Sequence, residues 1–263
     1  MKIKENIVKR ILIVVFALLL SLNFSIAKQD MLFIGEELFY EVTFLGIKLG
    51  SIKLVTEKET DFNGKKAFKV KGYLNSYKGI PFVDLESVFE SWLDPSATYS
   101  YKFIGNVKSN NNRNKQEIEF DYTKGLIKNK QSKNNELEFN NTIKTNKKWS
   151  EGLSILFLAR KFANLKRTIK IPTIIYKDTC STTINFMGKQ ETVNISAYKK
   201  PIKTLYFTGL ADWEGIYGLS GKFEGWFSDD EAHVPIKAKM NVYVGSVVIE
   251  LKEWKRGSWN PPS

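Results

Sequence analysis

The feature that most limits the fold is an alternation of apolar and polar residues that recurs through most of the chain after its N-terminal segment. It is clear in Leu38–Phe44, in Ser51–Val55 and in Ala67–Lys71. A period of two is typical of half-buried strands, because successive side chains point to opposite faces. Asn63-Gly64, between the second and third segments, accepts the positive φ angles of a tight turn, which predicts an antiparallel hairpin.

Similar short segments follow along the rest of the chain. So many short strands at close spacing predict a sandwich, a barrel or a strongly curved sheet. The further strand candidates are Leu85–Leu93, Tyr99–Val107, Gln116–Tyr122, Leu126–Lys130, Thr168–Tyr176, Thr182–Phe186, Glu191–Ser196, Thr204–Thr208, Lys222–Ser228, Ile236–Val244 and Ser246–Leu251.

One segment breaks the alternation. In Gly152–Leu165, apolar residues crowd around more than one face of a helix, and Ser150 is placed to cap its start. A helix that is apolar nearly all round is a buried helix. It is expected to pack into the concave face of the curved sheet.

Two segments are expected to contain irregular structure. Asn106 to Asn146 is polar and contains 11 asparagines, which predicts two mobile hairpin ends without a domain boundary. The tail from Trp254 to Ser263 contains Pro261-Pro262 and is expected to be irregular. Residues 28–263 are therefore interpreted as a single β-rich domain.

Residues 1–27 have the three parts of a secretory signal, namely a basic start, the apolar run Ile11–Leu22 and the small residues Ser25 and Ala27. An uncleaved membrane anchor is the alternative, but this apolar run falls well short of the ~20 residues that a spanning helix needs. The single cysteine, Cys180, leaves no thiol after the cleavage site to take a lipid. The sequence therefore predicts a periplasmic protein, cleaved near Ala27, that is neither a lipoprotein nor stably membrane-spanning.

The formal net charge of +12 comes almost entirely from lysine. Arginine is the residue that reads guanine edges and clamps phosphates in a bidentate way, and the chain has few arginines. Nucleic acid is therefore not expected as a partner. Attraction to anionic lipid headgroups or to anionic envelope polymers remains open.

Catalysis is limited by the single histidine, His233, which follows Asp229 and Asp230. These three residues are the best candidates for a hydrolase or a metal site, but a solvated turn between two strands accounts for them better. The chain has no Gly-x-Ser-x-Gly motif, no phosphate-binding loop and no dinucleotide fingerprint. Cys180 has no histidine near it in sequence, so we expect no catalytic residue, no metal and no cofactor.

The aromatic content of 13% exceeds what turns require, and most of these rings are expected to form the core. If the helix covers the mouth of the curved sheet incompletely, the lining becomes a pocket for an apolar ligand. The candidate lining residues are Tyr40, Phe157, Phe162, Phe223 and Trp226.

Four sequence blocks together resemble the DUF3108 domain, a family of exported bacterial proteins of unknown function. The resemblance covers Gly35 to Leu251, although Glu151 and Gly152 stand where the family's helical segment is associated with Asp and Pro. The blocks are Gly35-Glu36-x-Leu38-x-Tyr40 with Gly46 and Gly50; Phe82-Val83-Asp84 with Ser91-Trp92-Leu93-Asp94; Ser150–Ser154 through Arg160; and Trp226–Asp230 with Val234-Pro235-Ile236 and Gly245-Ser246-Val247.

The resemblance implies a mainly β fold, a strongly curved antiparallel sheet that forms a half-barrel around one buried helix, similar to the periplasmic lipoprotein carriers. It implies that the matched glycines serve backbone geometry and that Arg160 forms a structural ion pair with Asp229 or Asp230. Pro235 and Gly245 belong to the same structural motif.

Three functions are left open. The first is a soluble periplasmic carrier of a lipid, an acyl chain or a lipidated peptide or protein. The second is a structural or adaptor protein of the envelope whose cavity is filled and whose basic surface binds anionic polymers. The third is an enzyme or metal site built around Asp229, Asp230 and His233.

Overall fold

The computed structural model describes residues 31–80, 84–215, 220–242 and 245–263. The predicted export signal, residues 1–27, lies outside these ranges, as do Phe82 and Val83 of the second sequence block and the last two residues of the strand predicted at Ile236–Val244.

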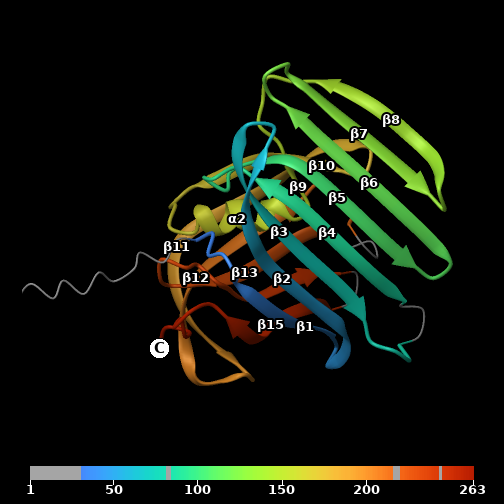
Figure 1. Ribbon diagram of the computed structural model, residues 1–263. Coiled ribbons are helices and arrows are strands. Elements are labelled where there is room, and N and C mark those ends of the chain that lie inside the picture. The colour runs from blue at the N-terminus through green and yellow to red at the C-terminus, as the bar shows by residue number, and fades with distance from the viewer. Residues whose placement is uncertain (1–30, 81–83, 216–219, 243–244) are drawn as a thin grey trace, which may run out of the picture.

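The described chain forms one 15-stranded sheet that wraps around the helix α2 (Figure 1). Its strand order is β8-β7-β6-β5-β4-β3-β2-β1-β15-β14-β13-β12-β11-β10-β9, so the first and last strands of the chain meet in the middle of the sheet. Neighbouring strands are antiparallel except for the short β9, which is parallel to β10. The mainly β, strongly curved antiparallel sheet predicted for this chain is confirmed.

The elements follow one another closely along the chain. They are β1 (Glu37–Phe44), β2 (Ile47–Phe62), β3 (Lys65–Ser76), β4 (Leu85–Leu93), β5 (Ser100–Ser109), β6 (Asn112–Asp121), β7 (Leu126–Lys133), β8 (Glu136–Lys144), β9 (Ser150–Glu151), α2 (Ser154–Lys161), β10 (Thr168–Ile175), β11 (Asp178–Ile195), β12 (Tyr198–Ala211), β13 (Gly221–Ser228), β14 (Pro235–Asn241) and β15 (Ser246–Lys255).

The helix α2 lies between two apolar clusters inside the curve of the sheet. Phe157 belongs to the first cluster, which also contains Leu38 and Tyr40 of β1. Leu158 and Ala159 belong to the second, which β10 to β13 complete. A helix that is apolar on more than one face can bury each face against a different part of a curved sheet. The predicted buried helix is therefore confirmed, although it is shorter than Gly152–Leu165.

The prediction that Ser150 caps the helix is wrong. Ser150 lies in β9, and the N-cap residue is Leu153, whose side chain makes no capping hydrogen bond. The buried carboxylate of Glu151 performs this role, because it accepts hydrogen bonds from the amides of Leu153 (2.8 Å) and Ser154 (3.3 Å). A carboxylate satisfies the unpaired amides of a helix start and complements its dipole.

The hairpin ends predicted between Asn106 and Asn146 lie at the β5–β6 and β7–β8 turns, but most of this segment is strand. This segment forms the paired strands β6 to β8 and the end of β5. Its polarity has a different cause, since β8 is exposed along most of its length and needs no apolar face. Asparagine acts at the turns, where Asn110, Asn134 and Asn135 have positive φ angles of 51°, 50° and 70°.

The tail is more ordered than its sequence indicates. β15 continues to Lys255, and the indole of Trp259 is buried and donates a hydrogen bond to Asp230 Oδ2 (2.7 Å). Near the end of the chain, the carbonyl of Pro262 accepts a hydrogen bond from the Lys203 amide (2.8 Å). The tail is thus held against the sheet by one buried aromatic ring and by main-chain hydrogen bonds.

Glu250 of β15 makes the stability of this part of the sheet depend on pH. Burial raises its pKa, but hydrogen bonds from the Ser196 amide and from the ammonium groups of Lys252 and Lys237 outweigh burial and lower the pKa to about 2. A carboxyl group whose folded pKa lies below its unfolded pKa stabilises the fold above the unfolded value and loses that contribution as the pH falls.

We therefore expect Glu250→Gln to lower the free energy of unfolding by about 1–2 kcal/mol near neutral pH, after allowance for solvent screening. The difference between the parent and the variant should shrink as the pH falls from 4.5 toward 2. Urea denaturation at a series of pH values measures it. A difference that stays constant over this range would contradict the assignment.

Candidate functional site

The most buried ion pairs in the described chain join one carboxylate to two guanidinium groups. Arg160 of α2 binds Glu36 in a bidentate way, with Nη1–Oε1 and Nη2–Oε2 distances of 2.6 and 3.0 Å, and Arg256 Nη1 contacts the same carboxylate. All three side chains are at most 2% exposed. The Arg160 guanidinium also donates to the carbonyls of His233 (Nε, 3.1 Å) and Ala232 (Nη2, 3.1 Å).

This cluster acts as a structural clamp. Burial lowers the pKa of Arg256 and would lower that of Arg160, but the Glu36 carboxylate opposes it, so that the pKa of Arg160 is raised. Groups that stay charged at neutral pH do not exchange protons with a substrate. The contacts instead join α2, the residue before β1, the β13–β14 turn and the chain after β15. The predicted partner of Arg160 was Asp229 or Asp230; that prediction is wrong, because Glu36 takes this place.

Asp229, Asp230 and His233 lie in the turn between β13 and β14, as the turn interpretation predicts. Their side chains are directed to different partners. Asp230 accepts from Ser228 Oγ (2.8 Å) and Trp259 Nε1 (2.7 Å), whereas Asp229 Oδ2 accepts from Gln190 Nε2 (2.7 Å). The three residues do not share a ligand position.

His233 is buried, and its Nε2 is paired with Asn164 Nδ2 at 2.9 Å. Burial lowers its pKa, which favours the neutral ring and fits an Nε2 that accepts the amide proton. In the described parts of the chain, no three His, Cys, Asp or Glu side chains gather in a way that could hold a metal ion. The geometry therefore gives no support to a metal-dependent reaction at this turn.

Cys180 offers no nucleophile. Burial raises the pKa of its thiol to about 11, and its Sγ donates to the Thr173 carbonyl (3.2 Å). A reactive cysteine needs the opposite shift, toward the thiolate at neutral pH.

The five aromatic residues expected to line a cavity lie in three different environments. Tyr40 and Phe157 are buried in the first apolar cluster, and the Tyr40 hydroxyl donates to the Pro235 carbonyl (3.0 Å). Phe162 and Phe223 are half-buried against the second cluster. Trp226 packs against Tyr206 and under Lys239, and its Nε1 donates to Glu191 (2.7 Å). The five rings therefore do not enclose one common space.

The glycines of the sequence blocks occupy positions that favour glycine. Gly35, Gly46 and Gly245 have φ angles of 83°, 81° and 82°, in the left-handed region. At Gly50 a Cβ atom would collide with the carbonyl oxygen of Asn75 on β3. Their expected role in backbone geometry agrees with these positions.

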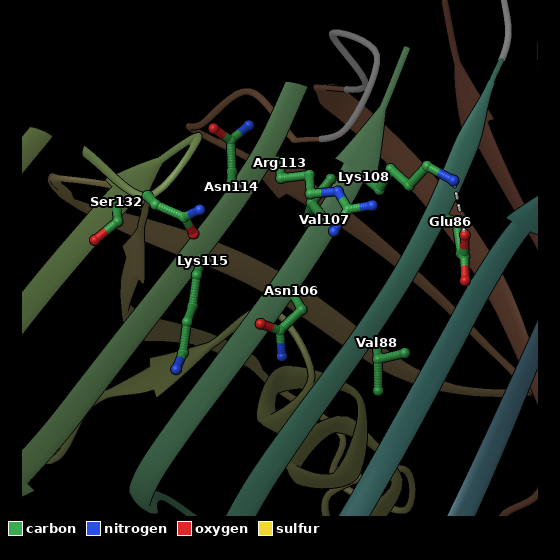
Figure 2. A pocket seen from close by; sticks show the side chains of 10 residues that line it. Glu86, Val88, Asn106, Val107, Lys108, Arg113, Asn114, Lys115 and Ser132 are labelled. Atoms are coloured by element: carbon green, nitrogen blue, oxygen red, sulfur yellow. Dashed lines mark hydrogen bonds and ion pairs between the residues drawn. The ribbon is translucent and has the colours of Figure 1, made fainter. Parts of the chain in front are cut away.

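An open groove of about 490 Å³ lies over β4 to β7, and three cations line it (Figure 2). Strand register explains why they meet: Lys108 is opposite both Glu86 and Arg113, while Lys115 is opposite Asn106. Directly opposed residues point to the same face of a sheet. Because the next residue, Ser87, is buried on the core side, this face is the outer one. The groove lining also includes Val88, Val107, Asn114, Ser132 and Asn135.

The groove has an excess of positive charge. One carboxylate, Glu86, faces the three cations and pairs with Lys108 at 3.3 Å. The next carboxylate on this face, Glu117, is already paired with Lys102. Most of the other lining residues are polar, apart from Val88 and Val107. Asn106 and Ser132, which are both opposite Lys115, offer an amide and a hydroxyl on this face. The arrangement suits an anion that also accepts and donates hydrogen bonds.

Sequence reasoning missed these residues because they lie in the segment interpreted as loops. The signal was present in the alternation of Arg113 and Lys115, which places two cations on one face of a strand. A second hollow, of about 450 Å³, lies on the outer face of β1 to β3 and is lined by Glu37, Phe39, Ser51, Lys53, Val55, Tyr73 and Asn75.

Together, the fold and these surfaces define a curved, barrel-like β protein with the two hollows described above on the outer face of its sheet. The family model for proteins of unknown function DUF3108 matches residues 40–252, and the chain belongs to this family. No curated protein matches it in sequence. A solved structure similar to it is the beta-barrel-like protein of the domain of unknown function DUF1849 from Brucella abortus, with a TM-score of 0.55 and 11% identity over 85% of this chain and 98% of the other. At this identity, the likeness shows the fold alone.

Proposed function

We propose that this chain is an exported binding protein of the cell envelope that holds anionic polymers on the outer face of its sheet. The observation that carries the proposal is the groove over β4 to β7, in which Lys108, Arg113 and Lys115 face a single carboxylate. Its export rests on the signal in residues 1–27, and its location in the periplasm is part of the same proposal.

The chemistry of the lining favours phosphate or carboxylate groups on a hydroxyl-rich chain. Arginine can bind an oxyanion in a bidentate way, whereas lysine supplies a mobile point charge. The asparagine amides and the Ser132 hydroxyl can bond to sugar hydroxyls. The groove is open, so a long polymer can lie along it without its ends being enclosed by the protein.

The carrier role implied by the resemblance would need space between the sheet and α2. Tyr40 and Phe157 are packed in the first apolar cluster, so an acyl chain or lipid would have to displace the helix that carries Phe157. The surface role needs no such movement, and for this reason it is the function we favour. Co-purification of a lipid would favour the carrier.

We expect the double variant Arg113→Gln/Lys115→Gln to bind dextran sulfate about tenfold more weakly than the parent, because two charge-assisted contacts are lost. Binding of the parent should itself weaken as salt is added, and neutral dextran should not bind. Fluorescence anisotropy with labelled polymers measures all three.

Lys199→Gln/Lys200→Gln is the matched control, since it removes the same charge from two exposed lysines at the start of β12. It should bind nearly as well as the parent. An equal loss in both double variants would show that net charge, and not the groove, attracts the polymer. That result would overturn the proposal.

A further inference from the structure

The tip of the β1–β2 hairpin exposes two large apolar side chains. Leu45 is 66% exposed and Ile47 is 58% exposed. A Cβ atom built on Gly46 between them would meet nothing within 4 Å. Leu45 lies beside Gly245, where an added Cβ atom would be 3.0 Å from its Cδ2, yet most of the leucine side chain remains exposed.

The backbone makes the leucine more unusual. Leu45 and Gly46 have φ angles of 48° and 81°, close to the 53° and 76° of Asn63 and Gly64 in the β2–β3 hairpin. Asparagine tolerates the left-handed region, but a bulky apolar residue is strained there. The chain thus places leucine at a turn position that asparagine fills in the neighbouring hairpin. A residue that is both strained and exposed points to a role outside folding.

Cations lie beside the tip on the same rim of the sheet. Because successive strands are antiparallel, the ends of β1, β3 and β5 lie along one rim (Figure 1). Lys48 and Lys78 are exposed there, next to the groove residues Lys108 and Arg113. The acidic residues of this rim are Glu41, which pairs with Lys48 at 2.9 Å, Asp84, and Glu86, which pairs with Lys108.

We propose that this rim docks onto the surface of an anionic lipid bilayer, with Leu45 and Ile47 inserted at the level of the headgroups. Apolar side chains that enter the interface, flanked by lysines that face lipid phosphates, are what peripheral membrane binding requires. A protein partner fits less well, because a stable interface buries about 800 Å² per partner and a narrow hairpin tip offers much less. The docking site goes beyond the polymer groove: its inserted residues, Leu45 and Ile47, do not line the groove, although the two surfaces meet at Lys108 and Arg113.

The test uses the exported, processed chain, its N-terminus read by sequencing, and vesicles of phosphatidylcholine with or without phosphatidylglycerol. We expect co-sedimentation with the anionic vesicles and little with the neutral ones. Leu45→Asn should reduce binding about tenfold, because an inserted aliphatic side chain is lost. Its fold should be kept, since Asn63 occupies the same kind of turn.

Ile34→Asn is the matched control, because Ile34 is 50% exposed and precedes β1 at the opposite rim. It should bind vesicles like the parent, and Leu45→Asn should still bind dextran sulfate. Failure of the parent to bind anionic vesicles would overturn the proposal. So would equal binding by the parent and Leu45→Asn, or an equal loss in Ile34→Asn.

Discussion

Glu36→Gln is expected to lower the free energy of unfolding by about 3–5 kcal/mol, because it leaves two buried guanidinium groups without their shared carboxylate. Arg160 and Arg256 are fully buried on either side of Glu36, so water cannot replace the lost charge. The clamp also holds α2 to the residue before β1. The variant should therefore lose order at the helix as well as stability.

Glu37→Gln provides the control at the neighbouring position. Glu37 is paired with Lys53 and Lys255 at the surface, and exposed ion pairs contribute about 1 kcal/mol or less. Urea denaturation followed by tryptophan fluorescence compares the two variants. If both lose the same small amount of stability, the buried clamp does not hold the fold together.

Phe157→Ala is also expected to lower the free energy of unfolding by about 3–5 kcal/mol. Phe157 is 1% exposed in the first apolar cluster, so truncation removes a full ring from a packed site and leaves a cavity. The magnitude bears on function as well as on stability. An aromatic ring that lined an open ligand cavity would already be partly in water, and its removal would cost much less.

Phe162→Ala is the comparison for this measurement, because Phe162 is only half-buried at the C-cap of α2. It should cost clearly less than Phe157→Ala in the same denaturation experiment. A loss below about 1 kcal/mol for Phe157→Ala would contradict a packed interior.

The local pattern predicted much of the fold. Alternation identified most strands, and Asn63-Gly64 predicted the turn between β2 and β3, since both features depend only on neighbours in sequence. β8 was missed because it is exposed along most of its length and therefore lacks the alternation that marks a strand. The cap of α2 was missed because Glu151 acts through its side chain from within β9.

The site was less predictable, because its contacts span the whole chain. Glu36 and Arg256 are 220 residues apart and meet only because β1 pairs with β15 in the middle of the sheet. Lys108, Arg113 and Lys115 form a groove through strand register, which the sequence does not specify when a segment is polar on both faces. The turn at Asp229 and Asp230 was predicted correctly, since its composition alone indicates a turn.

The fold that the resemblance implies agrees with the structure. The proposed functions rest on this chain's own residues. The family is one of unknown function, and the similarity to the barrel-like protein from Brucella abortus is limited to the fold. Among the residues described, no helix is long and apolar enough to cross a bilayer. The proposed bilayer contact at Leu45 and Ile47 is peripheral and does not require one.

The central claim is that the interior of the curved sheet is filled by its own side chains and that binding takes place on the outer face. Native mass spectrometry of the protein purified after export tests this claim most directly. We expect the bare mass of the processed chain, with no adduct that survives gentle desolvation. A lipid that remains bound to the folded protein and is released when it unfolds would contradict the claim and favour a carrier.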